Sequence, residues 1–179
     1  NLQYSVAMTV LGKGNQWRKA AELFDDMEQR GVPRNGHCYS AVISALAEGR
    51  QPDAALRILA KMHNDQDIKP DVYSYSAAIS ACERAGRWEL AMQLLRQMDE
   101  MGITPNQYTY SAAIRACEQS NSWKHAVQLL SEMKSRGIEP NELCYNAAIR
   151  ACGAFKQRQE AIRLFERMDL NPCLKPNVQ

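Results

Sequence analysis

Small hydrogen-bonding side chains recur in two columns along this 179-residue chain, at spacings of 35 or 36 residues. Hydroxyl and amide groups both donate and accept hydrogen bonds, whereas carboxylates only accept them. Columns of this kind can distinguish ligands by their pattern of donors and acceptors. The first column consists of Ser5, Ser40, Ser76, Ser111 and Asn146, and the second of Asn35, Asp71, Asn106, Asn141 and Asn177.

Both columns also have a purely structural interpretation. Ser is favourable in the first turn of a helix, and Asn or Asp after Pro is a turn former that bonds its own backbone. The residue types alone therefore leave two possibilities open: a surface that reads a ligand, or a set of turn and helix-end residues.

Six cysteines and three histidines are the other residues with chemical potential. Three cysteines lie 35 residues apart, at a position where leucine occurs earlier in the chain, so we interpret them as buried hydrophobic residues. No C-x-x-C pair is present and the histidines are unrelated in position, so the sequence predicts no metal, no cofactor and no enzyme activity. The column consists of Cys82, Cys117 and Cys152, preceded by Leu11 and Leu46.

The composition excludes several classes of protein. With 45% hydrophobic and 23% charged residues, the chain is typical of a globular protein rather than a disordered or collagen-like one. Its apolar stretches are far shorter than the roughly 18 residues that a membrane span needs, so we expect no membrane partner. The formal net charge of +2 is too small to predict strong sequence-independent binding to nucleic acid.

The two polar columns belong to an internal repeat that fills the chain. Residues 72–106 align with residues 107–141 without a gap, with 19 identities in 35 positions. The same pattern fits five repeats, all of which carry Tyr at position 4, Ala at position 20 and Met at position 27. The repeats are residues 1–35, 36–71, 72–106, 107–141 and 142–177.

Each repeat contains two patterns with helical spacing. In the third repeat, apolar residues at i, i+3, i+4 and i+7 from Tyr75 to Cys82 predict a first helix, helix A. A second apolar face from Trp88 to Met98 predicts helix B, which should end near Gly102. An isolated pair of helices cannot bury both apolar faces, so the pairs must stack. The sequence therefore predicts an all-α fold, an α-solenoid of stacked helix-turn-helix repeats of 35–36 residues with a concave surface.

The residue types at the helix ends agree with these boundaries. Ser74 and Thr109, three positions into their repeats, can accept hydrogen bonds from the first free backbone N–H groups of helix A. Pro70, Pro105 and Pro140 prevent helix B from continuing into the next repeat. Positions 5, 9 and 12 of helix A lie on the side away from its apolar stripe, so we expect them to line the concave groove.

The repeat resembles that of the pentatricopeptide repeat family. Trp occurs at position 17, in helix B, whereas a tetratricopeptide unit places its Trp early in the first helix. The pentatricopeptide unit has the same length, the same Tyr, Ala and Met positions and a closing Gly-Ile-x-Pro-Asp/Asn. The resemblance covers residues 1–177 and, because long and short repeats do not alternate, it is to the plain class of the family. It implies a right-handed superhelix.

In this family the two polar columns pair to read one RNA base per repeat, so the resemblance implies sequence-specific binding of single-stranded RNA. An Asn amide matches N1 and the exocyclic amine of adenine, and an Asp carboxylate matches N1–H and the amino group of guanine. Asp71 should therefore select G, and the longer Asn146 should select a pyrimidine. With the N-terminus of the array toward the 5′ end of the RNA, the expected bases are A, G, A, A and then C or U.

The resemblance also implies stacking and phosphate-contacting residues. Position 2 corresponds to the wedge residue beside the base, and its aromatic members here either stack on bases or pack between repeats. Position 13, where the family tends to carry Lys against the RNA backbone, is basic only as Lys13 and Arg84. Arg115 and Arg150 at position 9 could partly compensate, so we expect weak electrostatic affinity. The position 2 residues are Leu2, His37, Tyr73, Tyr108 and Leu143.

Two functions follow from these expectations. The first is RNA binding by occupancy, which stabilises a transcript, guides its processing or keeps a ribosome site open. The second is a scaffold for other proteins in an organellar ribosome or RNA polymerase complex. The resemblance implies a chloroplast or mitochondrial location. Because five bases specify only one site in 1,024, we expect the chain to be part of a longer array.

Overall fold

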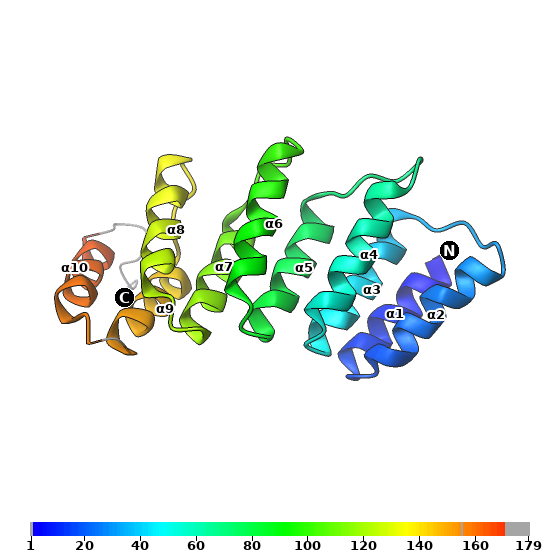
Figure 1. Ribbon diagram of the computed structural model, residues 1–179, viewed down its shortest axis with the longest axis horizontal. Coiled ribbons are helices and arrows are strands. Elements are labelled where there is room, and N and C mark those ends of the chain that lie inside the picture. The colour runs from blue at the N-terminus through cyan, green and yellow to red at the C-terminus, as the bar shows by residue number, and fades with distance from the viewer. Residues whose placement is uncertain (1, 155, 171–179) are drawn as a thin grey trace, which may run out of the picture.

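The computed structural model describes residues 2–154 and 156–170 of the chain, and within this part every regular element is an α-helix. The helices follow one another in pairs along the long axis of the molecule (Figure 1). This arrangement is an α-solenoid, as the repeat pattern predicts. Its helices are α1 (Leu2–Lys13), α2 (Trp17–Gln29), α3 (Gly36–Glu48), α4 (Pro52–Asn64), α5 (Val72–Arg84), α6 (Trp88–Glu100), α7 (Gln107–Gln119), α8 (Trp123–Ser135), α9 (Glu142–Ala154) and α10 (Arg158–Asp169).

The helices form two rows. The odd-numbered A helices contact one another in succession, from α1 to α3, α5, α7 and α9. Each even-numbered B helix packs on the A helix before it, and α2, α4, α6 and α8 also pack on the A helix that follows. Helices α3, α5 and α7 therefore each lie between two other A helices, and side chains from consecutive repeats meet along the A row.

The core lies between the two rows and is built from the same positions in each repeat. Tyr39, Tyr75, Tyr110 and Tyr145 at position 4 are all at most 1% exposed. The cysteines predicted to be hydrophobic residues are fully buried, which confirms that interpretation. Burial raises the pKa of Cys82 and of Cys117 to about 12, so both thiols stay neutral and unreactive near neutral pH.

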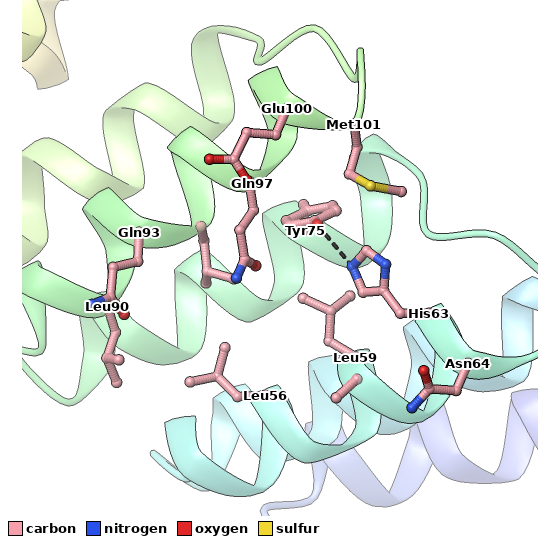
Figure 2. A pocket seen from close by; sticks show the side chains of 12 residues that line it. Leu56, Leu59, His63, Asn64, Tyr75, Leu90, Gln93, Gln97, Glu100 and Met101 are labelled. Carbon is pink, nitrogen blue, oxygen red and sulfur yellow. Dashed lines mark hydrogen bonds between the residues drawn. The ribbon is translucent and has the colours of Figure 1, made fainter.

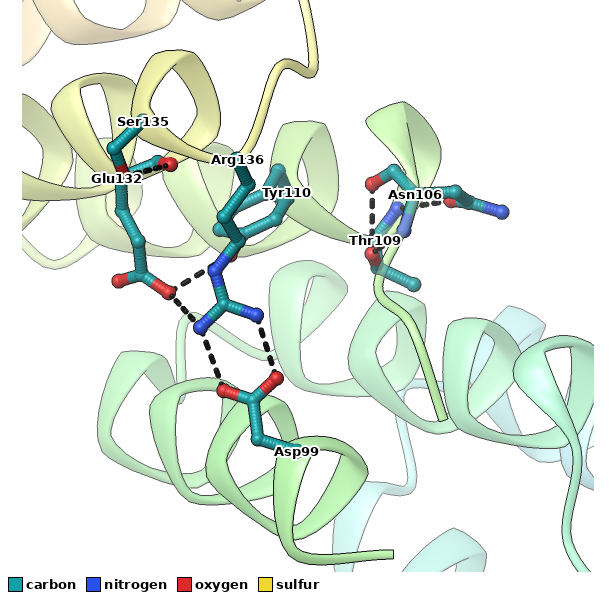
Figure 3. Close-up of polar contacts among 7 residues, drawn as sticks. All are labelled: Asp99, Asn106, Thr109, Tyr110, Glu132, Ser135 and Arg136. Carbon is teal, nitrogen blue, oxygen red and sulfur yellow. Dashed lines mark hydrogen bonds and ion pairs between the residues drawn. The ribbon is translucent and has the colours of Figure 1, made fainter. Parts of the chain in front are cut away.

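The A helices begin at the last residue of the preceding repeat, which acts as the N-cap. Asp71 accepts a hydrogen bond from the backbone N–H of Ser74 (2.9 Å), and the backbone N–H of Asp71 donates to the hydroxyl of Ser74 (2.9 Å). Asn106 and Thr109 form the same reciprocal capping box (Figure 3). The expectation for Ser74 and Thr109 was thus wrong in one respect, because each serves the N–H of the cap residue rather than those of the helix.

The A helices end with the chain in a left-handed backbone conformation at position 15. In α5, the N–H of Arg87 bonds the carbonyl of Cys82 (2.8 Å) and the N–H of Gly86 bonds that of Glu83 (3.0 Å). These two bonds form a Schellman motif, which requires a positive φ at Gly86. The same position has φ between 54° and 66° in each repeat, at Asn15, Arg50, Gly86, Asn121 and Lys156.

Candidate functional site

A hollow of about 750 Å³ runs along the A row across the first three repeats and reaches the start of the fourth. It brings together members of three predicted sets: position 2, position 5 and the last residue of a repeat. Apolar side chains, among them Val6, Val10 and Ala77, also line it. The predicted site residues that line it are Leu2, Ser5, His37, Ser40, Tyr73, Ser76, Asn106 and Tyr108.

The position 5 residues lie deeper than the sequence predicts. Ser5, Ser76 and Ser111 are only 7–9% exposed, because neighbouring A helices pack side by side over them. Each donates its hydroxyl to a carbonyl of its own helix; for Ser76 this is the carbonyl of Val72, at 2.5 Å. A hydroxyl that has donated its only hydrogen retains oxygen lone pairs, so toward the hollow Ser5 and Ser76 are hydrogen-bond acceptors.

Ser111 is the most enclosed of the three serines. Besides donating to the carbonyl of Gln107 (2.8 Å), its oxygen lies 3.0 Å from the sulfur of Cys144 in α9. The Cys144 thiol, whose pKa is raised by burial, is the group left to donate in this contact. In the fifth repeat, Asn146 is half-buried and its amide nitrogen lies 3.4 Å from an oxygen of Glu142.

The last residues of the repeats cap the next A helix with one side-chain oxygen. Oδ1 of Asn35, Asp71 and Asn141 each accepts from the backbone N–H three residues later, at 2.9–3.0 Å. Oδ1 of Asn106 accepts two such bonds, while its amide nitrogen donates none of the bonds drawn in Figure 3. Because the cap uses only Oδ1, an Asn at this position can still donate its amide N–H groups to a ligand. An Asp can still accept with its second carboxylate oxygen. Asn177, the last member of the column, lies outside the described residues.

The position 2 side chains are exposed rather than packed between repeats. Leu2, Tyr73, Tyr108 and Leu143 are 58–76% exposed, and His37 is also exposed. Large apolar and aromatic surfaces left in solvent commonly mark a binding surface. Of the two interpretations of the aromatic members, their exposure contradicts packing between repeats, and stacking on bases stays a prediction.

The basic residues of the A row pair with glutamates of the preceding repeat. Arg84 lies 2.9 Å from Glu48, Arg115 lies 2.7 Å from Glu83, and Arg150 lies 2.6 Å from Glu118. The charge of Arg84 at position 13 is thus partly neutralised. The same holds for Arg115 and Arg150 at position 9. Lys13, the other predicted phosphate contact, is exposed at the end of α1.

Glu83 is the carboxylate of this set that burial affects most. Its side chain is only 9% exposed, and burial raises its pKa although Arg115 and Arg84 act in the opposite direction. Sequence reasoning missed these glutamates as partners of the arginines. The signal was present as acidic residues 32 or 36 positions before each arginine, but it identifies a pair only once the packing of the A helices is known.

The B row carries its own links between repeats and a separate hollow. Arg136 forms a bidentate ion pair with Asp99 of the preceding repeat (2.6 and 2.7 Å; Figure 3). Arg136 also pairs with Glu132, and Glu132 accepts a hydrogen bond from the hydroxyl of Tyr110. Between α4 and α6 lies a hollow of about 520 Å³, lined by four leucines together with polar residues, where the hydroxyl of Tyr75 lies 2.8 Å from Nε2 of His63 (Figure 2).

The described residues offer neither a candidate metal site nor a candidate membrane span. In residues 2–154 and 156–170, no three His, Cys, Asp or Glu side chains are grouped so as to hold a metal ion. Over the same residues, no helix combines the length and the apolar character that crossing a membrane requires.

Models of known protein families match almost the whole chain. The model of the PPR repeat family matches residues 3–48, 70–119 and 112–154, and that of the PPR repeat matches residues 37–66 and 143–173. The chain belongs to the pentatricopeptide repeat (PPR) family. The resemblance drawn from the repeat pattern is therefore confirmed.

Plant PPR proteins are similar to this chain in sequence. Two chloroplastic pentatricopeptide repeat-containing proteins of Arabidopsis thaliana are 34% identical over 97 residues and 32% identical over 99 residues. These alignments cover 54% and 55% of this chain and 20% of each relative. A putative mitochondrial member from the same plant is 32% identical over 76 residues, which is 42% of this chain and 12% of that protein. The chain thus spans about a fifth of the length of the first two relatives.

Solved PPR structures share the fold. The crystal structure of PPR10 from maize aligns with a TM-score of 0.78 and 23% identity over 93% of this chain and 24% of that chain. PPR10 in complex with an 18-nt psaJ RNA element aligns equally well, at 24% identity over 90% of this chain and 24% of that chain. The PPR domain of Arabidopsis protein-only RNase P 1, in complex with tRNA, has a TM-score of 0.75 at 16% identity over 90% of this chain and 84% of that domain. The predicted α-solenoid is confirmed.

Proposed function

We propose that this array binds single-stranded RNA along the A row, with one base per repeat. The observation that carries the proposal is the hollow in which exposed Tyr73 and Tyr108 lie beside Ser76 and Asn106. Exposed rings supply surfaces on which bases stack, and the polar groups beneath them supply hydrogen bonds to base edges. PPR10, a protein of the same family and fold, forms a complex with an RNA element.

The capping bonds give each pair of columns a defined hydrogen-bonding character. With Ser76 an acceptor and Asn106 left with its amide N–H groups, the pair complements adenine, whose amine donates and whose N1 accepts. Asp71, which the repeat pattern pairs with Ser40, instead retains its second carboxylate oxygen, because only Oδ1 accepts the capping bond from Ser74. Guanine, which offers N1–H and an amino group as donors, fits that pair. We therefore assign the second base to G.

The length of the position 5 side chain sets the size of the base. Short serines leave room for a purine in the first four repeats, whereas Asn146 extends further and suits a pyrimidine in the fifth. In the order of the repeats from the N-terminus, the preferred RNA is 5′-AGAA followed by C or U. This pattern retains the base order that the sequence predicts but assigns adenine recognition to the amide nitrogen of Asn.

Binding of this kind acts by occupancy and involves no reaction. An array that covers a transcript segment blocks nucleases, keeps a ribosome site open or guides a processing factor. The relatives named chloroplastic and mitochondrial favour an organellar location for the protein.

The direct test is fluorescence anisotropy with a labelled RNA that contains AGAAC and one that contains AAAAC. The natural chain should prefer the first RNA by about tenfold, since a good base-specific contact contributes roughly 1–3 kcal/mol of discrimination. Asp71→Asn keeps the capping oxygen and exchanges an acceptor for a donor, so its preference should move to AAAAC.

Two outcomes would count against the proposal. Equal affinity of the folded natural chain for both RNAs would exclude base reading by Asp71. If neither RNA binds, the same pair of RNAs is compared on a longer stretch of the array, and absence of binding there excludes RNA as the ligand of the groove.

Protein binding is a second candidate function, favoured by the hollow on the B row. Leu56, Leu59, Leu90 and Leu94 line it between α4 and α6, on helices that do not form the RNA groove (Figure 2). If the chain is a scaffold, its binding to a partner protein should survive Asp71→Asn and be lost in Leu56→Glu. An RNA reader should show the reverse.

A further inference from the structure

A third hollow is lined mainly by residues from the second half of the A helices, together with Tyr108 in the first turn of α7. It has a volume of about 390 Å³, and its walls come from three consecutive repeats. Arg50 follows α3, Arg84 ends α5 and Arg115 lies in α7, while Glu83 supplies a carboxylate at its edge. Unlike the hollow near the caps, it is lined almost entirely by polar side chains.

The hollow carries an excess of positive charge. Three guanidinium groups line it against the single carboxylate of Glu83, and counting Glu48, the partner of Arg84, still leaves one positive charge. In the described part of the chain Arg50 takes part in no ion pair. Arg84 and Arg115 each contact their glutamate partner through one terminal guanidinium nitrogen. Their side chains are 42% and 46% exposed, respectively. Their remaining N–H donors are available to an anion.

Arg50 occupies a backbone position that disfavours its side chain. It is the left-handed residue of a Schellman motif and has a φ of 54°. The backbone N–H of Arg50 donates to the carbonyl of Ala47 (3.0 Å), and the N–H of Gln51 donates to the carbonyl of Leu46 (2.9 Å). Gly or Asn adopts this conformation at lower cost, and three of the five repeats carry one of them. A side chain kept at a strained position where a better residue is available is typical of a functional site.

The charged hollow is continuous with the proposed RNA path. Tyr108 lines both this hollow and the one that holds Ser76 and Asn106. A base stacked on that ring would leave its backbone near the arginines. RNA carries one phosphate per nucleotide, and planar guanidinium groups bind phosphate oxygens through paired N–H donors.

We propose that Arg50, Arg84 and Arg115 form a subsite for a backbone phosphate of the bound RNA, with Glu83 reducing its strength. This proposal rests on the RNA-binding function proposed above. It adds a contact from the turn between helices A and B, at position 15, to those predicted from positions 9 and 13.

The test separates charge from backbone strain with three variants. Arg50→Asn removes the charge and relieves the strain, so the melting temperature should rise by about 2 °C. The same variant should lose roughly five- to tenfold in affinity for the AGAAC RNA at 50 mM salt, and its slope of log K against log salt should fall by about 0.7. Arg50→Lys keeps the charge and should bind nearly as the natural chain does. Arg57→Gln, at an exposed arginine of α4 on the B row, is the matched control for loss of one charge.

The expected result is greater stability with weaker binding in Arg50→Asn alone. The phosphate subsite is excluded if Arg50→Asn binds RNA with the affinity and salt slope of Arg57→Gln. In that case a retained preference of the natural chain for G over A shows that the base-reading proposal itself still stands. If neither the natural chain nor a longer stretch of the array binds RNA, both proposals are wrong.

Discussion

The two ends of the A helices present different surfaces. At the starting end, caps and exposed rings surround a largely apolar hollow, whereas toward the finishing end arginines and the carboxylate of Glu83 surround a polar one. Helices α5 and α7 line both hollows, and Tyr108 lies in the wall of each. The difference suggests a division in which the starting end reads bases and the finishing end holds the RNA backbone. Changes at one end should therefore alter selectivity, and changes at the other should alter salt dependence.

The largest expected effect is at Tyr108, which lines both hollows. Tyr108→Ala should weaken RNA binding by about 1–3 kcal/mol, the usual contribution of stacking one base on an aromatic ring. Tyr108→Phe keeps the ring and is the control, with affinity close to that of the natural chain. Because Tyr108 is 63% exposed, thermal melting should show little loss of stability in either variant. Equal affinities of the two variants in an anisotropy titration would exclude stacking.

A second effect separates capping from reading at the starting end. Asp71→Ala removes the capping oxygen from α5 and should lower the free energy of unfolding by about 1 kcal/mol, measured by urea denaturation. Asp71→Asn retains that oxygen and should lower it by much less, while changing the preferred base. If both substitutions destabilise the chain equally, the capping role of Asp71 is wrong.

At the finishing end, Glu83→Gln should increase RNA affinity and make its salt dependence steeper, because Arg115 loses its neutralising partner. Burial raises the pKa of Glu83 in the folded chain. Protonated Glu83 therefore favours folding, and its contribution to the free energy of unfolding is complete below its ordinary pKa of 4.5. That contribution is lost as the pH rises through the raised pKa.

The stability of Glu83→Gln relative to the natural chain should therefore improve from about pH 4 toward neutral pH. Urea denaturation at several pH values measures this difference. A constant difference between the two proteins would show that Glu83 does not titrate as its burial requires.

The smallest effect should come from the B row, which lies outside the proposed RNA path. Arg136→Gln breaks the bidentate pair with Asp99 and should cost no more than about 1 kcal/mol of stability, because these groups are partly exposed. The pKa of Asp99, held low by Arg136, should return toward its ordinary range. RNA affinity should not change in anisotropy measurements. A loss of affinity as large as that in Arg50→Asn would contradict the separation between the rows.

Much of the fold could be predicted from the sequence, because helix pairs and their buried faces depend on local patterns. The Tyr75-to-Cys82 stripe, for example, predicts one face of α5 and the burial of its cysteine. The depth of Ser76 and the pairing of Arg115 with Glu83 depend on how adjacent A helices pack, which no single repeat encodes. The left-handed conformation of Arg50 was also missed, since Arg is not a residue that normally signals such a turn.

The central claim is that each repeat reads its own base in register. The most direct measurement uses the double variant Asp71→Asn, Asn106→Asp. In this variant the acidic member of the last-residue column belongs to the third repeat instead of the second. Anisotropy titrations with AGAAC and AAGAC RNAs should show that the natural chain prefers the first and the double variant the second. Both substitutions retain the capping oxygens, so the two proteins should melt at similar temperatures. If the double variant keeps the preference of the natural chain, or loses all preference while remaining folded, the claim is wrong.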